Sequence, residues 1–227
     1  MVTAVQVKKY LQPLLDANDD LALVGRLLVM KPVTHILRAV IIDRRSSAET
    51  IVPIWFCYHM FGPFPDYSLN WGDRLWGHNW RTDDPNVSEA LCAAIENVAL
   101  PKIRPVTTIE AFHEALPVLS AHYGHRWEIL PDIKMLFDAA EGNIEAAKAL
   151  CRDKICTRAD PGPKEADVTI ATAAGAKKLC ALLANDDIAA VARTLHEWEE
   201  TNVRTLKLAP YWQPTPFPIE ERLGLTI

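Results

Sequence analysis

The sequence has little positive charge, and this limits the partners it is suited to bind. Lysine and arginine number 24 against 29 aspartates and glutamates, giving a formal net charge of −5. No basic cluster interrupts this pattern. Because phosphate backbones and anionic lipid surfaces attract basic patches, the composition argues against nucleic acid and membrane as partners.

Long apolar runs and a secretory leader are also lacking. No stretch reaches the roughly 18 consecutive apolar residues of a transmembrane helix. The N-terminus has no small-residue cleavage site after an apolar segment, so we expect no secretory signal. The cysteines are odd in number and loosely spaced: Cys57, Cys92, Cys151, Cys156 and Cys180. We therefore expect reduced thiols in a cytoplasmic protein.

Sequence motifs of high specificity are missing as well. No G-x-G-x-x-G follows a predicted strand, and no phosphate-binding P-loop or G-x-S-x-G nucleophile motif occurs. The pair His122 and His125, with Glu128 or Asp132 nearby, lacks the further ligands that a recognised zinc site has. We therefore expect no cofactor and no metal.

The first part of the chain predicts a helix followed by strands. Residues 3–17 fit an amphipathic helix. Three runs rich in aliphatic and β-branched residues follow, at 21–30, 33–43 and 50–60. Their short polar breaks favour antiparallel hairpins, and we expect a small sheet of three to four strands. In the second run, Thr34 and Arg38 share one face, which we expect to be partly solvated.

Helical patterns dominate after residue 85. Asn86 or Ser88 and then Thr108 supply cap chemistry, and Pro101 is expected to kink or end the first helix. Further helices are predicted over 131–140, 143–152, 164–183 and 186–205. Strands grouped before helices predict an α+β fold. Because no linker interrupts the chain, we expect a single domain over 1–227, with a strand-rich half (1–85), a helical half (86–207) and a Pro-rich tail (208–227).

Aromatic residues gather in one glycine- and proline-broken stretch. Residues 55–80 contain nine of the chain's Trp, Tyr and Phe side chains, half of the total. A long loop rich in aromatics is expected to be ordered. Its rings either fold inward as a cover on the sheet or remain exposed and bind a partner. The residues predicted to bind are Trp71, Arg74, Trp76, Trp80 and Arg81.

Weaker candidates suggest catalysis or ligand binding instead. Cys57 and His59 share one face of a strand, where a thiolate and an imidazole could meet. Asp73 and His78 lie in the aromatic stretch. A small-ligand pocket beneath the rings could use Arg74, His78 or Arg38 as its polar contact.

The leading hypothesis is a non-enzymatic protein-binding module of the bacterial accessory kind, such as an inhibitor or immunity protein. Acidic surfaces suit basic partner proteins. The alternative is an enzyme or small-ligand binder with its pocket between the aromatic loop and the sheet. The Pro-rich tail, with Tyr211, Trp212 and Phe217, docks either on its own domain or on a second copy.

Overall fold

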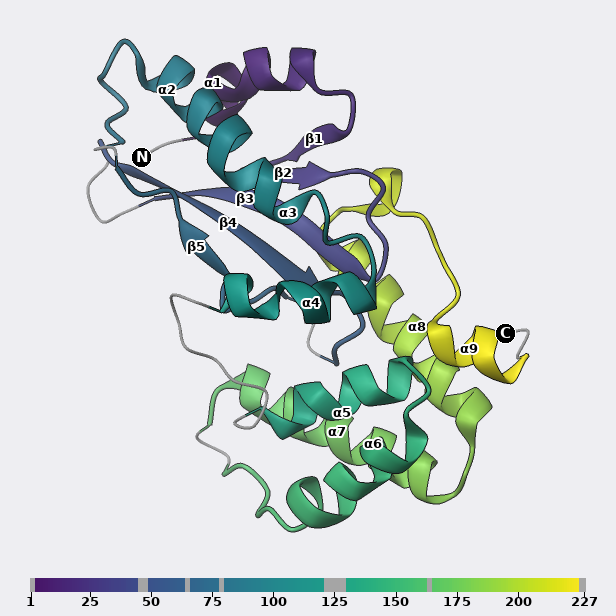
Figure 1. Cartoon of the computed structure of the whole chain (residues 1–227). Coiled ribbons are helices and arrows are strands. Elements are labelled where there is room, and N and C mark those ends of the chain that lie inside the picture. The colour runs from purple at the N-terminus through teal and green to yellow at the C-terminus, as the bar shows by residue number, and fades with distance from the viewer. Residues whose placement is uncertain are drawn as a thin grey trace. The chain divides into compact units, whose positions relative to one another are not determined.

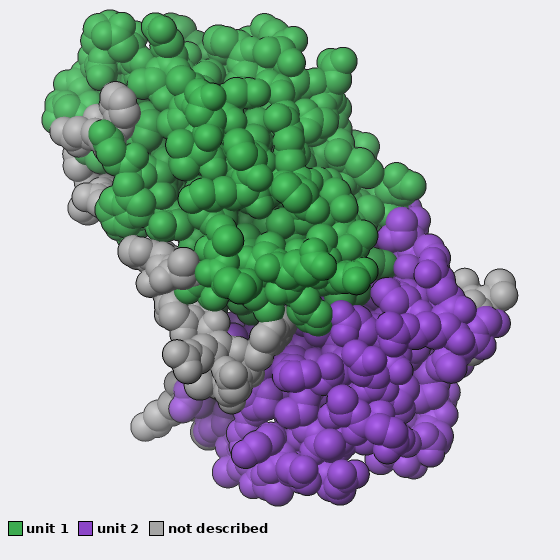
Figure 2. Space-filling view, viewed as in Figure 1, with its two compact units in different colours: residues 1–58, 68–124, 208–213 green, residues 59–67, 125–207, 214–227 purple. Residues whose placement is uncertain are grey.

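The computed structural model of the chain contains two compact units (Figure 2). Unit 1 comprises residues 1–58, 68–124 and 208–213, and unit 2 comprises residues 59–67, 125–207 and 214–227. The prediction of a single domain stays a prediction. The structure describes residues 3–44, 49–63, 66–77, 80–120, 130–162 and 165–224.

Unit 1 is built on a five-stranded antiparallel sheet, ordered β1-β2-β3-β4-β5 (Figure 1). It is wider than the three to four strands predicted, partly because the run 21–30 contains a hairpin. Gly25, with φ +64°, makes the turn, since glycine adopts positive φ at no steric cost. The strands are β1 (Leu21–Val24), β2 (Leu27–Met30), β3 (Ile36–Arg44), β4 (Ile51–His59) and β5 (Gly72–Arg74).

The central strand β3 is buried on both faces, contrary to the prediction of a partly solvated face. Arg38 is only 6% exposed. Its guanidinium donates to the carbonyl oxygens of Pro32 and Arg104, each at 3.1 Å. These hydrogen bonds compensate part of the cost of burying the charge, and desolvation lowers the pKa of Arg38.

The helices of unit 1 lie against this sheet. Figure 1 shows α1 and α2 side by side across it. Thr3 caps α1 in a capping box with Gln6, as cap chemistry favours. Pro101 does not end the helical run: a π-helical segment precedes it, and Pro101 lies in the first turn of the short helix that continues to Ile103. The helices are α1 (Ala4–Ala17), α2 (Val87–Ala94), the π-helix η1 (Ile95–Ala99), α3 (Leu100–Ile103) and α4 (Ile109–Leu119).

Unit 2 is helical, so the chain as a whole has the predicted α+β class. Successive helices from α5 to α8 pack against one another (Figure 1). Gly142 has φ +79° and makes the predicted break after α5. The elements are α5 (Pro131–Ala140), α6 (Ile144–Leu150), the π-helix η3 (Cys151–Ile155), α7 (Asp167–Ala184), α8 (Ile188–Thr205) and α9 (Pro218–Leu223).

An aromatic cluster forms part of the core of unit 2. The ring of Phe61 meets those of Phe137 and Phe217 edge to face, with centroids 5.2 and 5.3 Å apart. His59, the last residue of β4, contacts the same cluster. The buried amide of Asn202 on α8 donates to the carbonyl oxygens of Met60, Gly62 and Trp198 at 2.6, 3.0 and 3.1 Å, which fixes the segment after β4 against α8.

The Pro-rich tail is partly extended, and it also contains the short 3₁₀ helix η4 (Ala209–Tyr211) and α9 (Pro218–Leu223). Trp212 forms a parallel bridge with Val33. The Val33 N–H donates to the Tyr211 carbonyl, and the Gln213 N–H donates to the Val33 carbonyl, both at 2.8 Å. This part of the tail therefore docks on its own chain, which is one of the two alternatives predicted from the sequence.

Candidate functional site

The aromatic stretch is attached to the sheet through its edge strand. Phe56 of β4 lies opposite Gly72 of β5 in the antiparallel register. A Cβ at Gly72 would overlap the carbonyl oxygen of Trp55 and lie 2.7 Å from Phe56 Cα. The close approach of the two backbones therefore requires glycine at this position.

Two of the three tryptophans in the stretch are core residues. Trp71 is 2% exposed, and its ring meets that of Phe112 edge to face with centroids 5.4 Å apart. Trp80 is 6% exposed and donates its Nε1–H to the Leu75 carbonyl at 2.8 Å. Both rings stabilise the core of unit 1, and neither presents its face to solvent. Of the two alternatives predicted for the aromatic rings, folding inward is therefore the one that Trp71 and Trp80 adopt.

Trp76 is the exception, with an exposed fraction of 60%. Its Nε1–H donates to Asp73 Oδ1 at 2.9 Å. The Arg74 guanidinium carbon lies 5.7 Å from the ring centroid, within cation–π range. Asp73 also accepts the Arg74 backbone N–H at 2.6 Å. Asp73, one of the weak catalytic candidates, therefore has a structural role: it orients an indole ring that remains in solvent.

Arg81 is already engaged by neighbouring carboxylates. Its Nε and Nη2 donate to the two oxygens of Asp83 at 2.8 and 2.6 Å, and Nη2 also donates to Glu49 at 3.0 Å. The hydrogen bonds from Arg81 lower the pKa of Asp83. These groups are exposed, so the pairs add little to stability. Their effect is to offset the charge of Arg81, so its guanidinium is already bound within the chain.

Cys57 and His59 lie on β4 as predicted, but their surroundings do not activate a nucleophile. Both side chains are buried. Burial raises the pKa of the Cys57 thiol to about 12, against the opposing charge of Arg38, and burial lowers the pKa of His59 to about 3. A thiolate–imidazolium pair needs the reverse shifts. At neutral pH the two groups are a neutral thiol and a neutral imidazole.

Several sequence candidates lie outside the described residues. These are His78 of the aromatic stretch and the residues His122, His125 and Glu128 of the histidine motif. Asp132 is described, and it binds Arg158 in a two-point ion pair at 3.0 Å. Within the described ranges, no three His, Cys, Asp or Glu side chains gather as a metal ion would need.

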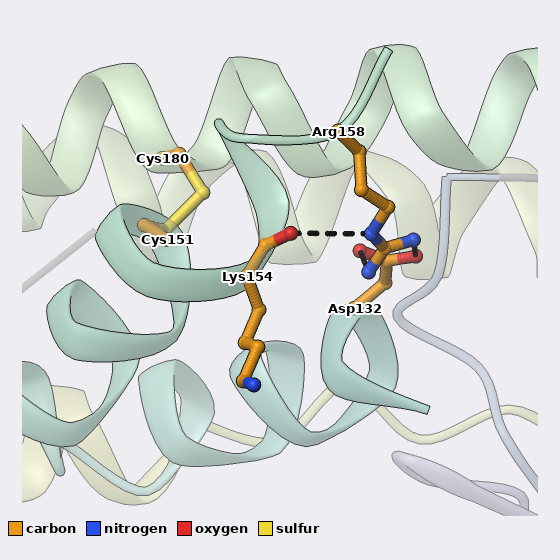
Figure 3. The surroundings of a disulfide bond; sticks show 5 residues. All are labelled: Asp132, Cys151, Lys154, Arg158 and Cys180. Carbon is orange, nitrogen blue, oxygen red and sulfur yellow. Dashed lines mark hydrogen bonds and ion pairs between the residues drawn. A yellow bond between two sulfur atoms is a disulfide. The ribbon is translucent and has the colours of Figure 1, made fainter. Parts of the chain in front are cut away.

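Sequence reasoning missed a disulfide in unit 2. Cys151, at the start of η3, is joined to Cys180 of α7 (Figure 3). The prediction that all five cysteines are reduced thiols is therefore wrong for these two. Both lie on the apolar sides of their helices, which was a visible signal, but their pairing requires α7 to return beside η3. Spacing along the chain does not determine that return.

The end of η3 is fixed by an arginine (Figure 3). Arg158 donates its Nε–H to the Lys154 carbonyl at 3.2 Å while Asp132 of α5 binds its other two nitrogens. The network bridges the last turn of η3 to the start of α5. It holds in place the turn that carries Cys156, which is an exposed free cysteine.

No family model, no curated protein and no solved structure matches this chain. Among the described helices, none has the length and apolar character needed to cross a bilayer. Two places in the structure offer geometry from which a function can be inferred: the exposed Trp76 of unit 1, and the region of unit 2 that holds Cys151, Cys156 and Cys180.

Proposed function

We propose that the chain is a non-enzymatic protein-binding module whose anchor is Trp76. The observation that carries the proposal is a large indole ring that stays mostly in solvent while Asp73 and Arg74 restrain it. Tryptophan and arginine are enriched among the residues that dominate interface energies. A side chain already held in one orientation loses less conformational entropy on binding.

The net charge of residues 66–84, the segment that carries Trp76, favours a basic partner surface. Between residues 66 and 84, four aspartates outnumber two arginines, and one of those arginines, Arg81, is engaged by Asp83 and Glu49. Complementary charge speeds encounter and selects among partners. An inhibitor or immunity-type protein of bacterial kind would act in this way, by covering a basic site on its target.

The test compares capture by three forms of the full chain: the unaltered protein, Trp76→Ala and the control Val118→Ala. Val118 is an exposed apolar side chain of unit 1, 53% accessible, outside the aromatic stretch. Proteins captured by the first and third forms but lost with Trp76→Ala are purified, and their affinity is measured by calorimetry at two salt concentrations.

We expect Trp76→Ala to weaken binding by about 30-fold or more, which corresponds to roughly 2 kcal/mol. Affinity for a basic partner should also fall as salt rises. A purified partner that binds Trp76→Ala as tightly as the unaltered protein would end the proposal. The absence of any Trp76-dependent partner would do the same.

The alternative, an enzyme or small-ligand binder with a pocket between the aromatic loop and the sheet, stays a prediction. Single substitutions of Cys57 and His59 discriminate it, because a hydrolytic activity that survives both excludes that pair. A cytoplasmic location also stays a prediction. The Cys151–Cys180 disulfide weighs against it, since disulfides persist mainly in oxidising compartments.

A further inference from the structure

Three of the five cysteines line one hollow in unit 2. The hollow has a volume of about 400 Å³, within the range of small-molecule sites, and is lined by Lys148, Cys151, Arg152, Cys156, Cys180 and Ala184. Cys151 and Cys180 form the disulfide and are only 6% and 3% exposed. Cys156 is a free thiol and is exposed. A buried disulfide and an accessible thiol therefore line the same hollow.

The π-helix η3 turns Cys156 toward the side of the helix that carries Cys151. In a regular α-helix, a residue five positions further on points roughly 140° away. Here the Cys156 N–H donates to the Cys151 carbonyl at 2.8 Å, the i→i+5 bond of a π-turn. Relative to an α-helix, the wider turn rotates Cys156 toward the side of the helix that carries Cys151. Without it, Cys156 would face away from the disulfide.

Two cations lie at the hollow. Lys148 Nζ is bound by Glu145 and Asp186 at 3.1 and 2.6 Å, so its charge is largely offset. Arg152 has a looser pairing, with Nε 3.7 Å from Asp153, and is 69% exposed. The thiolate form of a cysteine is the nucleophile in exchange with disulfides. Arg152 also offers a contact for a carboxylate on an incoming thiol.

We propose that this hollow is a thiol–disulfide exchange site through which the buried disulfide reacts with small anionic thiols. The Cys156 thiolate attacks the Cys151 sulfur. The Cys156–Cys151 bond forms, the Cys151–Cys180 bond breaks, and Cys180 leaves as a thiolate that takes the proton given up by Cys156. This step is redox-neutral. Two molecules of an external thiol then reduce the accessible Cys151–Cys156 bond to two protein thiols, and the thiols themselves are oxidised to their disulfide.

Tryptic mapping of the full, oxidised chain distinguishes the possible disulfides. The cysteines fall in separate tryptic peptides, 149–152, 155–158 and 179–193. The protein is held at pH 8, quenched in acid, alkylated with a maleimide and digested, and linked peptides are identified by mass spectrometry. We expect the 149–152 peptide to be found linked both to 179–193 and to 155–158. A link to 179–193 alone would contradict the first step.

Reduction kinetics test the role of Cys156 and of Arg152. Reduction by glutathione, an anionic thiol, is compared with reduction by cysteamine, a cationic one. We expect Cys156→Ser to slow reduction about tenfold or more, because the direct route requires attack on a buried sulfur. Arg152→Gln should abolish any preference for glutathione. The control Cys92→Ser, at a half-buried thiol of unit 1, should react at the original rate.

Besides the mapping result above, two kinetic outcomes would overturn the proposal. One is reduction of Cys156→Ser at the unaltered rate, which would show that external thiols reach the disulfide directly. The other is equal reduction by glutathione and cysteamine in the unaltered protein, which would remove the case for an anionic thiol. Because Cys156 is exposed and serine is close to it in size, the variant is expected to fold, and circular dichroism checks this.

Discussion

Acid should destabilise this protein specifically through His59. The imidazole is buried against Phe61 and Phe137, with ring centroids 5.4 and 5.5 Å apart. Burial lowers its pKa from the ordinary 6.5 to about 3. Between these values the unfolded chain binds a proton that the folded chain does not. Stability from this group is therefore fully present above pH 6.5 and is lost as the pH falls towards 3.

The size of the effect follows from linkage. Within this window the free energy of unfolding changes by about 1.4 kcal/mol per pH unit for one such group. From pH 7 to pH 4 the loss assigned to His59 is about 3 kcal/mol, a large share of the roughly 5–15 kcal/mol typical of folded domains. His59 is only 3% exposed, so solvent screening reduces this figure little.

Urea unfolding at pH 7 and pH 4 measures the effect. Carboxylates also titrate in this range, so the informative quantity is the difference between variants. His59→Gln, neutral at every pH, should lose about 3 kcal/mol less than the unaltered protein on acidification. His113→Gln, at a half-exposed site on α4, should behave like the unaltered protein. If both variants and the unaltered protein lose equal stability within about 0.5 kcal/mol, the reasoning on His59 is refuted.

Three further predictions concern stability. Gly72→Ala should lower the free energy of unfolding by about 3 kcal/mol or more, because a Cβ would strike the β4 backbone. The control Gly162→Ala has open space around it and should leave the free energy of unfolding nearly unchanged, and urea titrations measure both variants. Cys151→Ala with Cys180→Ala removes a cross-link over 29 residues and should cost roughly 3.5 kcal/mol, a loss that reductant reproduces only in the unaltered protein. Asn202→Ala leaves buried carbonyl groups without their amide donor and should cost about 2 kcal/mol, seen as faster hydrogen exchange in α8.

Much of the fold could be predicted because its signals are local. Thr3, Thr108 and Gly142 mark helix ends through caps and a positive-φ break that need only neighbouring residues. The order of strands before helices predicted the α+β class, which is confirmed. The hairpin at Gly25 was missed because a continuous aliphatic run can contain a two-residue turn without losing its strand-like composition.

The site was predicted only in part, since exposure depends on what packs against each ring. Trp71, Trp76 and Trp80 have the same chemistry and similar neighbours in sequence, yet two are buried and one is in solvent. The difference comes from Phe112 and Leu75, one of which lies far along the chain from the ring that it meets. No local pattern carries that information.

The sequence by itself determined the order of strands before helices, the positions of most helices and the aromatic character of the 55–80 stretch, because composition and periodicity act over a few residues. Tertiary structure alone decided that His59 would be neutral, that Trp76 would remain exposed, and that Cys151 would meet Cys180 in a hollow that Cys156 also lines. Those outcomes depend on which helices pack against one another and on how completely the packing excludes water. Both are properties of the packed chain and not of any segment within it.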